Sequence, residues 1–152
     1  MTSTSSHFTA EHFLPFDLPP DAVRWLLDLW HVIQVWDDVA DDDVVARADL
    51  DRAIFASLVT LPANPFYLTH AQALAPMLAG LVLKWKAADD AEILGTADER
   101  SFMWRAGYYD VILTIVMLVH GGTKAMSVAR HIMKLYGEPF AEYRKEFPCP
   151  TP

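Results

Sequence analysis

The chain has little cysteine: its one thiol, Cys149, lies in the proline-rich tail at residues 148–152. A single thiol cannot form a disulfide within the chain, and it cannot build a cysteine-based zinc site. Proteins without disulfides are typical of reducing compartments. We therefore expect this protein to be cytoplasmic.

Positive charge and long apolar runs are also scarce. Lys and Arg number 12 against 20 Asp and Glu, which gives a net charge of −8. Surfaces that bind nucleic acid are basic, so this class of partner is not expected. The most apolar segment, residues 111–119, is shorter than the roughly 20 residues that cross a bilayer. Residues 1–20 lack the apolar core of a secretory signal. We expect no nucleic-acid and no membrane partner.

Several catalytic signatures are missing from the sequence. It has no H-E-x-x-H zinc-hydrolase pattern, no G-x-S-x-G nucleophile motif, no phosphate loop and no dinucleotide fingerprint. Enzymes that depend on these motifs are therefore not indicated.

The hydrophobic pattern predicts an all-α fold. Apolar residues recur at helical spacing, and Gly and Pro fall where helices should end. We expect an antiparallel bundle of about five to six helices. A flexible arm at residues 1–19 should precede a single domain over residues 20–147, with Phe13, Leu14 and Phe16 as possible anchors of the arm. The expected helices cover residues 21–41, 50–60, 65–92, 97–120, 123–136 and 139–147.

Local signals set the expected helix ends. Asp49 is the expected cap of the second helix, and Pro62 its end. Asn64 followed by Pro65 combines an N-cap with a proline at the first helical position, which predicts the start of the third. We expect a kink at Pro76. Thr96 and Glu99 have capping-box spacing for the fourth helix.

The most informative segment is the acidic block Asp37-Asp38-Val39-Ala40-Asp41-Asp42-Asp43, at the end of the first helix. Like charges four residues apart repel by a few tenths of a kcal/mol, and the helix dipole opposes negative charge at this end. A divalent cation would reverse both effects, since Mg²⁺ prefers carboxylate oxygens. Two interpretations are open: a metal site, or a solvated helix end.

The string from Asp37 to Asp42 resembles the D-D-x-x-D motif of class I isoprenoid synthases, in particular the trans-prenyl diphosphate synthases. The resemblance covers residues 31–47 and lacks the second metal motif of that family. It implies that Asp37 and Asp41 bind Mg²⁺ and, through it, a diphosphate, with Asp38 in support. By the same resemblance Arg47 would contact the diphosphate, and His31 stands near the family's histidine.

Two residues of the fourth helix complete the predicted site. Asp110 lies in an apolar segment, so it should be at least half buried and should have a partner. It is our candidate for a metal ligand on a second helix; the alternative is a polar anchor that fixes helix register. Arg105 points about 140° away from Asp110, so we expect it to contact a diphosphate or Asp38 instead. Lys84 should lie at the surface.

The sequence supports three functional hypotheses. The first is a small protein that binds Mg²⁺ and a diphosphate-containing ligand. The second is an all-α nucleotide pyrophosphohydrolase, in which Asp38, Asp41 and Asp110 replace the usual glutamates. The third is a non-catalytic interaction or assembly protein, since the chain also resembles small helical proteins of tailed-phage genomes. A first helix that is apolar over more than half its circumference further suggests a homodimer.

Overall fold

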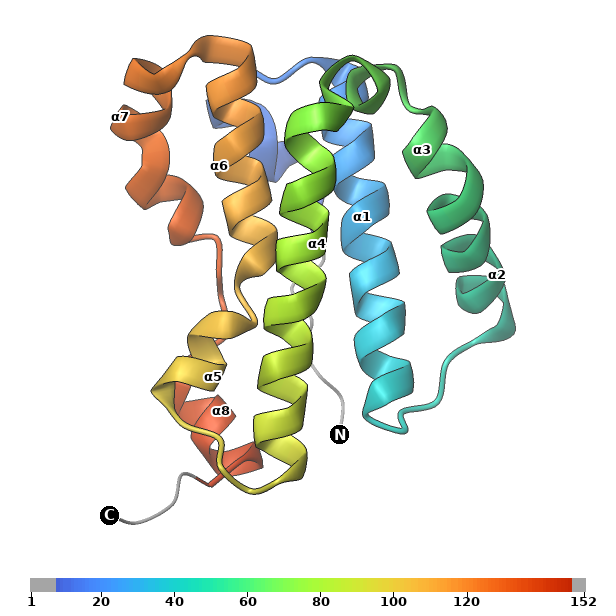
Figure 1. Cartoon of the computed structure of the whole chain (residues 1–152), viewed down its shortest axis with the longest axis vertical. Helices are drawn as coiled ribbons and strands as arrows, with labels where there is room; N and C mark the ends of the chain where they lie inside the picture. Colours follow the sequence, from blue (N-terminus) through green and yellow to red (C-terminus); the bar gives the residue numbers. More distant parts are fainter. Residues whose placement is uncertain (1–7, 149–152) are drawn as a thin grey trace. The chain divides into compact units, whose positions relative to one another are not determined.

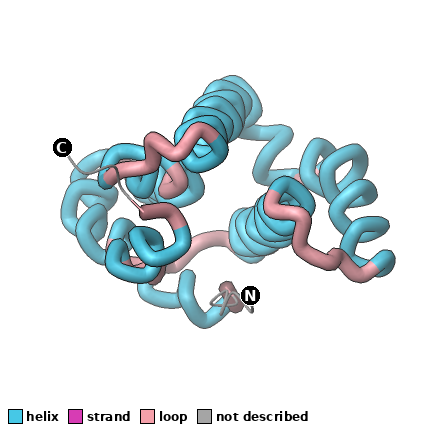
Figure 2. The backbone as a smooth tube through the Cα atoms, turned by 90° about the horizontal axis from the view of Figure 1, so that it is seen from below, coloured by secondary structure: helices cyan, strands magenta, loops and turns pink. Residues whose placement is uncertain are grey.

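The computed structural model describes residues 8–148, which form helices and no strand (Figure 1, Figure 2). The all-α prediction is therefore confirmed. Contacts are concentrated in two compact units that divide between Ala71 and Gln72. Cys149 lies outside the described residues, as does the first part of the N-terminal arm. The predicted domain bounds stay a prediction.

The first unit is built around α1, and the following helical segments return along it (Figure 1). Trp25 and Leu26 of α1 are fully buried, and Trp25 stacks on Tyr67 with ring centroids 5.6 Å apart. The elements of this unit are η1 (Ala10–Phe16), α1 (Pro20–Ala40), α2 (Arg47–Phe55), η2 (Ala56–Thr60) and α3 (Leu61–Ala63).

The arm before α1 is more structured than predicted. Its described part contains a 3₁₀ helix, η1, whose Phe13 and Phe16 are buried. Leu14 is exposed instead, so it does not act as an anchor. The two phenylalanines supply enough apolar burial to hold a short helix that would not form alone.

The second helical segment begins earlier and ends later than predicted. Helix α2 starts at Arg47 after an N-cap at Ala46, so Asp49 lies in the first turn and is not the cap. Pro62 does not end the segment. Its ring crowds the carbonyl of Leu58, four residues earlier, and it has no N–H to donate. The chain widens into the π-helical η2, where Leu61 N–H donates to Ala56 O.

Helix α4 (Pro65–Ile93) begins in the first unit and continues into the second. Its start is as predicted: the Asn64 side-chain oxygen accepts hydrogen bonds from Phe66 N–H and Tyr67 N–H. The predicted kink at Pro76 is wrong in position. The non-helical residue is His70, in the turn region that precedes the proline. A proline ring clashes with the carbonyl four residues earlier, here that of Gln72, so the clash does not reach His70, which lies six residues before Pro76.

The second unit contains the rest of α4 together with α5 (Glu99–Trp104), α6 (Gly107–His120), α7 (Gly122–Met133) and α8 (Phe140–Glu146). Helix α7 packs along α6, and α8 lies against α5 (Figure 1). The predicted end of α6 at His120 is confirmed. The cap of α5 is Asp98, which accepts from Arg100 N–H and Ser101 N–H, and not Thr96.

We predicted a single helix over this range, but the structure has two separate helices, α5 and α6. The break lies at Arg105 and Ala106, just before Gly107. A Cβ atom at Gly107 would lie 3.1 Å from the Cα atom of Leu81 in α4. The two helices therefore approach so closely here that a side chain in place of Gly107 would require the backbone of Leu81 to shift by a few tenths of an ångström.

Two helical stretches are long and apolar enough to cross a membrane by length and composition alone. They are Pro65–Ile93, of which 17% of the most apolar window is buried, and Glu99–His120, of which 44% is buried. The core helix of a soluble protein passes the same test, so the expected cytoplasmic location stays a prediction. The longer of the two stretches is α4, whereas the most apolar short run, residues 111–119, lies in the other.

Candidate functional site

The acidic block forms the C-terminal cap of α1. Asp41 N–H donates to Asp37 O at 3.0 Å, which keeps these two residues one helical turn apart. Asp43 N–H donates to Asp38 O at 2.9 Å, and Asp42 N–H to Val39 O at 3.3 Å. Asp42 has a φ of 58°, in the left-handed region. This is the Schellman arrangement, with aspartate in the position that glycine usually holds.

Negative charge is concentrated around Asp38. Burial raises its pKa above the ordinary value of 3.8, and the carboxylates of Asp37, Asp43 and Asp49 raise it further. Asp37 is half-buried and Asp41 is exposed. The end of α1 is thus a place where a bound cation would relieve repulsion between carboxylates.

The other predicted residues of the first unit have partners nearby. The His31 ring nitrogen Nε2 lies 3.2 Å from the backbone oxygen of Asp49. Arg47 Nε donates to Asp51 Oδ1 at 2.8 Å across an exposed i,i+4 pair. Arg47 is therefore the first residue of α2, and His31 contacts α2 through Asp49. Both are close in sequence to the acidic block.

Replacing Asp38 with asparagine is expected to stabilise the protein at neutral pH by about 0.3–1 kcal/mol, the scale of a charge opposed by a helix dipole. Because the folded-state pKa of Asp38 is raised, the folded protein loses stability as the pH rises through that pKa. The gain should thus be absent below pH 3.8 and complete above the raised pKa. Urea unfolding over a pH series measures this, and a gain that does not change with pH would contradict it.

In the second unit, Asp110 pairs with a residue that we expected at the surface. Lys84 Nζ of α4 donates to Asp110 Oδ2 of α6 at 2.8 Å, and the two side chains are 42% and 37% exposed. Asp110 is thus partly buried and has a partner, as predicted, but the partner is a lysine. The pair joins α4 to α6, which fits the alternative of a polar anchor. Its role as a metal ligand stays a prediction.

Arg105 lies in a cluster that was not predicted from the sequence. Its Nη1 is 3.5 Å from Glu92 Oε1 and 3.6 Å from Glu138 Oε2, and the side chain is 17% exposed. The guanidinium also lies over the ring of Tyr143, 5.5 Å from its centroid. The expected contact of Arg105 with a diphosphate or with Asp38 stays a prediction, because Asp38 belongs to the other unit.

Tyrosines complete the surroundings of Arg105. The Tyr143 hydroxyl is 2.6 Å from Ser101 Oγ, and burial raises the pKa of Tyr143 to about 12. The Tyr136 hydroxyl donates to Phe102 O at 3.0 Å, and burial raises its pKa strongly as well. The cluster ties the end of α4, the α5–α6 junction and α8 into one polar core within the second unit. The neutral tyrosines and the paired charges suit a structural role.

Within residues 8–148, no three His, Cys, Asp or Glu side chains are grouped so that they could hold a metal ion. The acidic end of α1 therefore offers a pair of carboxylates one turn apart and not a closed cage. Such a pair matches the demands of Mg²⁺, which keeps several waters and commonly takes one or two carboxylates plus phosphate oxygens.

Comparison with known proteins finds no matching family model, no similar curated protein and no similar solved structure.

Proposed function

We propose that the C-terminal end of α1 binds Mg²⁺ through Asp37 and Asp41 and, through the cation, a diphosphate-containing ligand. The observation that carries the proposal is the gathering of Asp37, Asp43 and Asp49 around Asp38, whose pKa is raised by burial and, to a smaller extent, by these three carboxylates. The hydrogen bond from Asp41 N–H to Asp37 O supports it, because it sets the two carboxylates one turn apart. Asp38 would support the site from the neighbouring side of the helix.

The pair would form an open site rich in water. Arg47 is exposed and held only by a surface ion pair with Asp51, which is worth less than about 1 kcal/mol. It is therefore available to exchange this partner for a phosphate oxygen. When bound, Mg²⁺ would neutralise the charge of a diphosphate and stabilise it as a leaving group. Asp110 and Arg105 belong to the second unit, and the proposal does not depend on them.

Calorimetric titration of Mg²⁺, with and without inorganic pyrophosphate, tests the proposal. A double variant, Asp37→Asn with Asp41→Asn, should lose at least about tenfold in Mg²⁺ affinity, the lower end of what removing even an outer partner of a metal costs. The matched control is Asp42→Asn with Asp43→Asn, which removes the same charge from the same block. Asparagine tolerates the left-handed conformation of residue 42.

Equal losses in the two double variants would show that cations respond only to total charge, and would overturn the proposed site. Undetectable binding to the wild-type protein would do the same. If binding is confirmed, incubation with nucleoside triphosphates and with prenyl diphosphates separates the two enzymatic hypotheses by the pyrophosphate that each releases. If the site binds Mg²⁺ but neither class of substrate releases pyrophosphate, the protein would be a binding protein.

A second candidate function, a non-catalytic interaction protein, is favoured by a separate observation. Helix α2 and the π-helical segment η2 expose large apolar side chains, among them Phe55 and Leu58. Exposed contiguous apolar surface is typical of interaction sites.

A further inference from the structure

The second unit carries a row of exposed basic side chains along α7. Its members are Lys124, Arg130, His131 and Lys134, all of which are exposed. At about 100° per residue they lie on one side of the helix. The opposite side includes Val128 and Ile132, which are buried where α7 packs along α6. We call these four residues the basic face.

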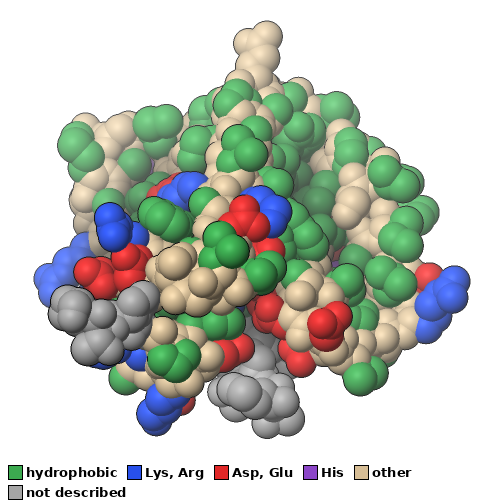
Figure 3. All heavy atoms as spheres, turned by 60° about the horizontal axis from the view of Figure 1, so that its bottom comes forward, with side chains coloured by type: hydrophobic (Ala, Val, Ile, Leu, Met, Phe, Trp, Pro, Cys, Tyr) green, Lys and Arg blue, Asp and Glu red, His purple; other side chains and the backbone are tan. Residues whose placement is uncertain are grey.

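The chain supplies no counter-charge to the basic face. The sequence has no Asp or Glu from residue 111 to residue 137. The nearest acidic residues on either side, Asp110 and Glu138, already contact Lys84 and Arg105. Within residues 8–148, the Lys and Arg residues of the basic face take part in no ion pair. This differs from the surface in Figure 3, where Lys and Arg side chains lie beside Asp and Glu side chains.

The basic face has the length of a short peptide. Lys124 and Lys134 lie ten residues apart in the sequence, which is about 15 Å along a helix. An extended chain covers that distance with about five residues. Met126, which is 76% exposed, lies one turn before Arg130 and adds a flexible apolar contact beside the charges. Methionine and arginine are both enriched where proteins bind one another.

We propose that the basic face binds an acidic peptide segment of another protein. Asp or Glu side chains of that segment would pair with Lys124, Arg130 and Lys134, as acidic motifs pair with basic clusters in other recognition domains. An apolar residue of the segment would cover Met126. The helix dipole helps at the start of α7, because the N-terminal end of a helix favours negative charge.

The charge of the same unit favours a short acidic ligand over a long or flat one. Residues 72–152 contain nine acidic and nine basic residues, and three of the basic ones belong to the basic face. Elsewhere in the unit, acidic residues therefore outnumber basic ones. Charges act over about 8 Å at physiological salt, so a short peptide responds to the basic face alone. A nucleic acid or an anionic membrane would also meet the surrounding negative charge.

Two further features argue against other occupants. The apolar side of α7, at Val128 and Ile132, is buried and is therefore not available to insert into a bilayer. A second copy of this chain carries the same net charge of −8, so the two copies repel each other at long range.

Binding of a fluorescent acidic peptide, measured by anisotropy in the presence of EDTA, tests this proposal apart from the metal site. The probe has about nine residues rich in Asp and Glu, enough to span the basic face with a margin at each end. The control peptide has Asn and Gln at the acidic positions. We expect only the acidic peptide to bind, and to bind more weakly as salt increases.

The decisive variant is Arg130→Gln with Lys134→Gln. It should weaken binding of the acidic peptide about fivefold or more, the scale of two exposed ion pairs. The matched control, Arg144→Gln with Lys145→Gln, removes the same charge from exposed positions of α8 in the same unit, and should change binding about twofold or less. Glutamine is a good helix former, so both variants should fold, which circular dichroism verifies.

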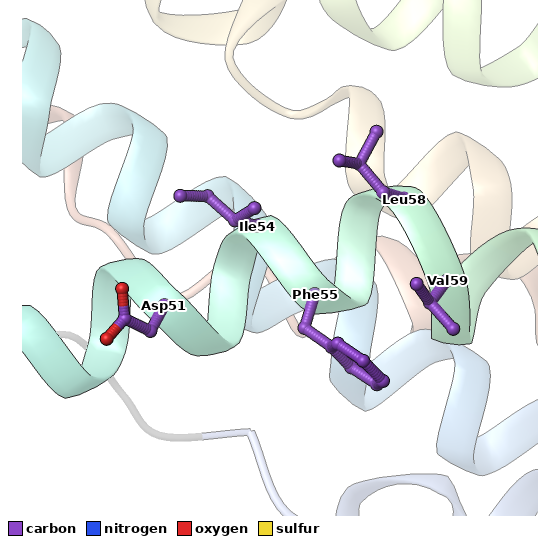
Figure 4. A pocket seen from close by; sticks show the side chains of 5 residues that line it. All are labelled: Asp51, Ile54, Phe55, Leu58 and Val59. Carbon is purple, nitrogen blue, oxygen red and sulfur yellow. The ribbon is translucent and has the colours of Figure 1, made fainter.

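Nuclear magnetic resonance locates the peptide. Amide signals of residues 122–134 should shift when the acidic peptide is added. Signals around the hollow on α2 and η2 should not, because that hollow is lined by four apolar side chains and Asp51 (Figure 4). The hollow is thus an internal control for binding elsewhere on the protein.

Several results would overturn the proposal. Equal losses in the two double variants would show that the peptide responds only to total charge. Equal binding of the Asn/Gln peptide, or shifts on α2 in place of α7, would show that the basic face is not what is recognised. Tighter binding of a single-stranded oligonucleotide or of phosphatidylserine vesicles, lost in Arg130→Gln with Lys134→Gln, would assign the face to that partner. A wild-type dimer in sedimentation that this variant converts to a monomer would assign it to a second copy.

Discussion

Replacing Arg105 with methionine is expected to lower the free energy of unfolding of the second unit by about 3–5 kcal/mol. The guanidinium lies between the carboxylates of Glu92 and Glu138, whose side chains are only 9% and 30% exposed. Methionine has a similar length and fills the same space, but it leaves two carboxylates poorly solvated and without their shared cation. Urea unfolding followed by circular dichroism measures the loss.

The matched control is Lys84→Met, which removes the cation of the ion pair between α4 and α6. The Lys84–Asp110 pair is about 40% exposed on each side chain, and pairs that water can reach contribute about 0–1 kcal/mol. The control should therefore lose far less than Arg105→Met. A second comparison adds Glu92→Gln to Arg105→Met, which should recover part of the loss because one uncompensated charge disappears. Equal losses for the two single variants would contradict the buried-cluster interpretation.

Some signals that act within about four residues were read correctly from the sequence, whereas the predicted caps Asp49 and Thr96 were not. Asn64 caps α4 as predicted, because its side chain bonds to N–H groups two and three residues ahead. The end of α6 at His120 followed from the glycine beside it. The same local logic failed at Pro62, since widening into a π-helical segment is an alternative to stopping. Whether the chain stops or widens depends on packing against α1, which a local pattern does not report.

Partners far apart in the sequence could not be predicted. The helical period correctly predicted that Arg105 points away from Asp110. It could not predict the contact with Glu138, which lies 33 residues later in the sequence, beyond two further helices. Lys84 was placed at the surface because an isolated lysine usually is, but it pairs with Asp110 one helical turn from the close contact between Leu81 and Gly107. That glycine, in the middle of an expected helix, was the available signal for a close approach.

The acidic block illustrates a different limit. Its spacing predicts both a helix cap and a cation site, and the structure shows the cap. The two roles are compatible, because the cap uses backbone N–H and C=O groups, whereas a cation would be bound by carboxylate oxygens. Only a binding measurement distinguishes a helix end that is merely solvated from one that holds a cation.

Replacing Trp25 with alanine should destabilise the first unit by about 3–5 kcal/mol, as large-to-small changes of buried aromatics do. Trp25 is fully buried and stacks on Tyr67 at an interplanar angle of 13°. Its loss would leave a cavity between α1 and the start of α4. Trp25→Phe should cost much less, because it keeps most of the ring and removes an Nε1–H that has no hydrogen-bond partner among the described residues.

The Trp25 and Arg105 variants together test whether the two compact units unfold as one. If unfolding is a single cooperative transition, both variants shift it, and the loss adds in the double variant because the two sites share no partner. If the units unfold separately, Trp25→Ala moves only one transition and Arg105→Met only the other. Pulse proteolysis with identification of the protected fragment distinguishes the cases.

A Trp25→Ala loss no larger than that of Trp25→Phe would show that the ring contributes little, and would contradict the role of Trp25 as the centre of the first unit's core.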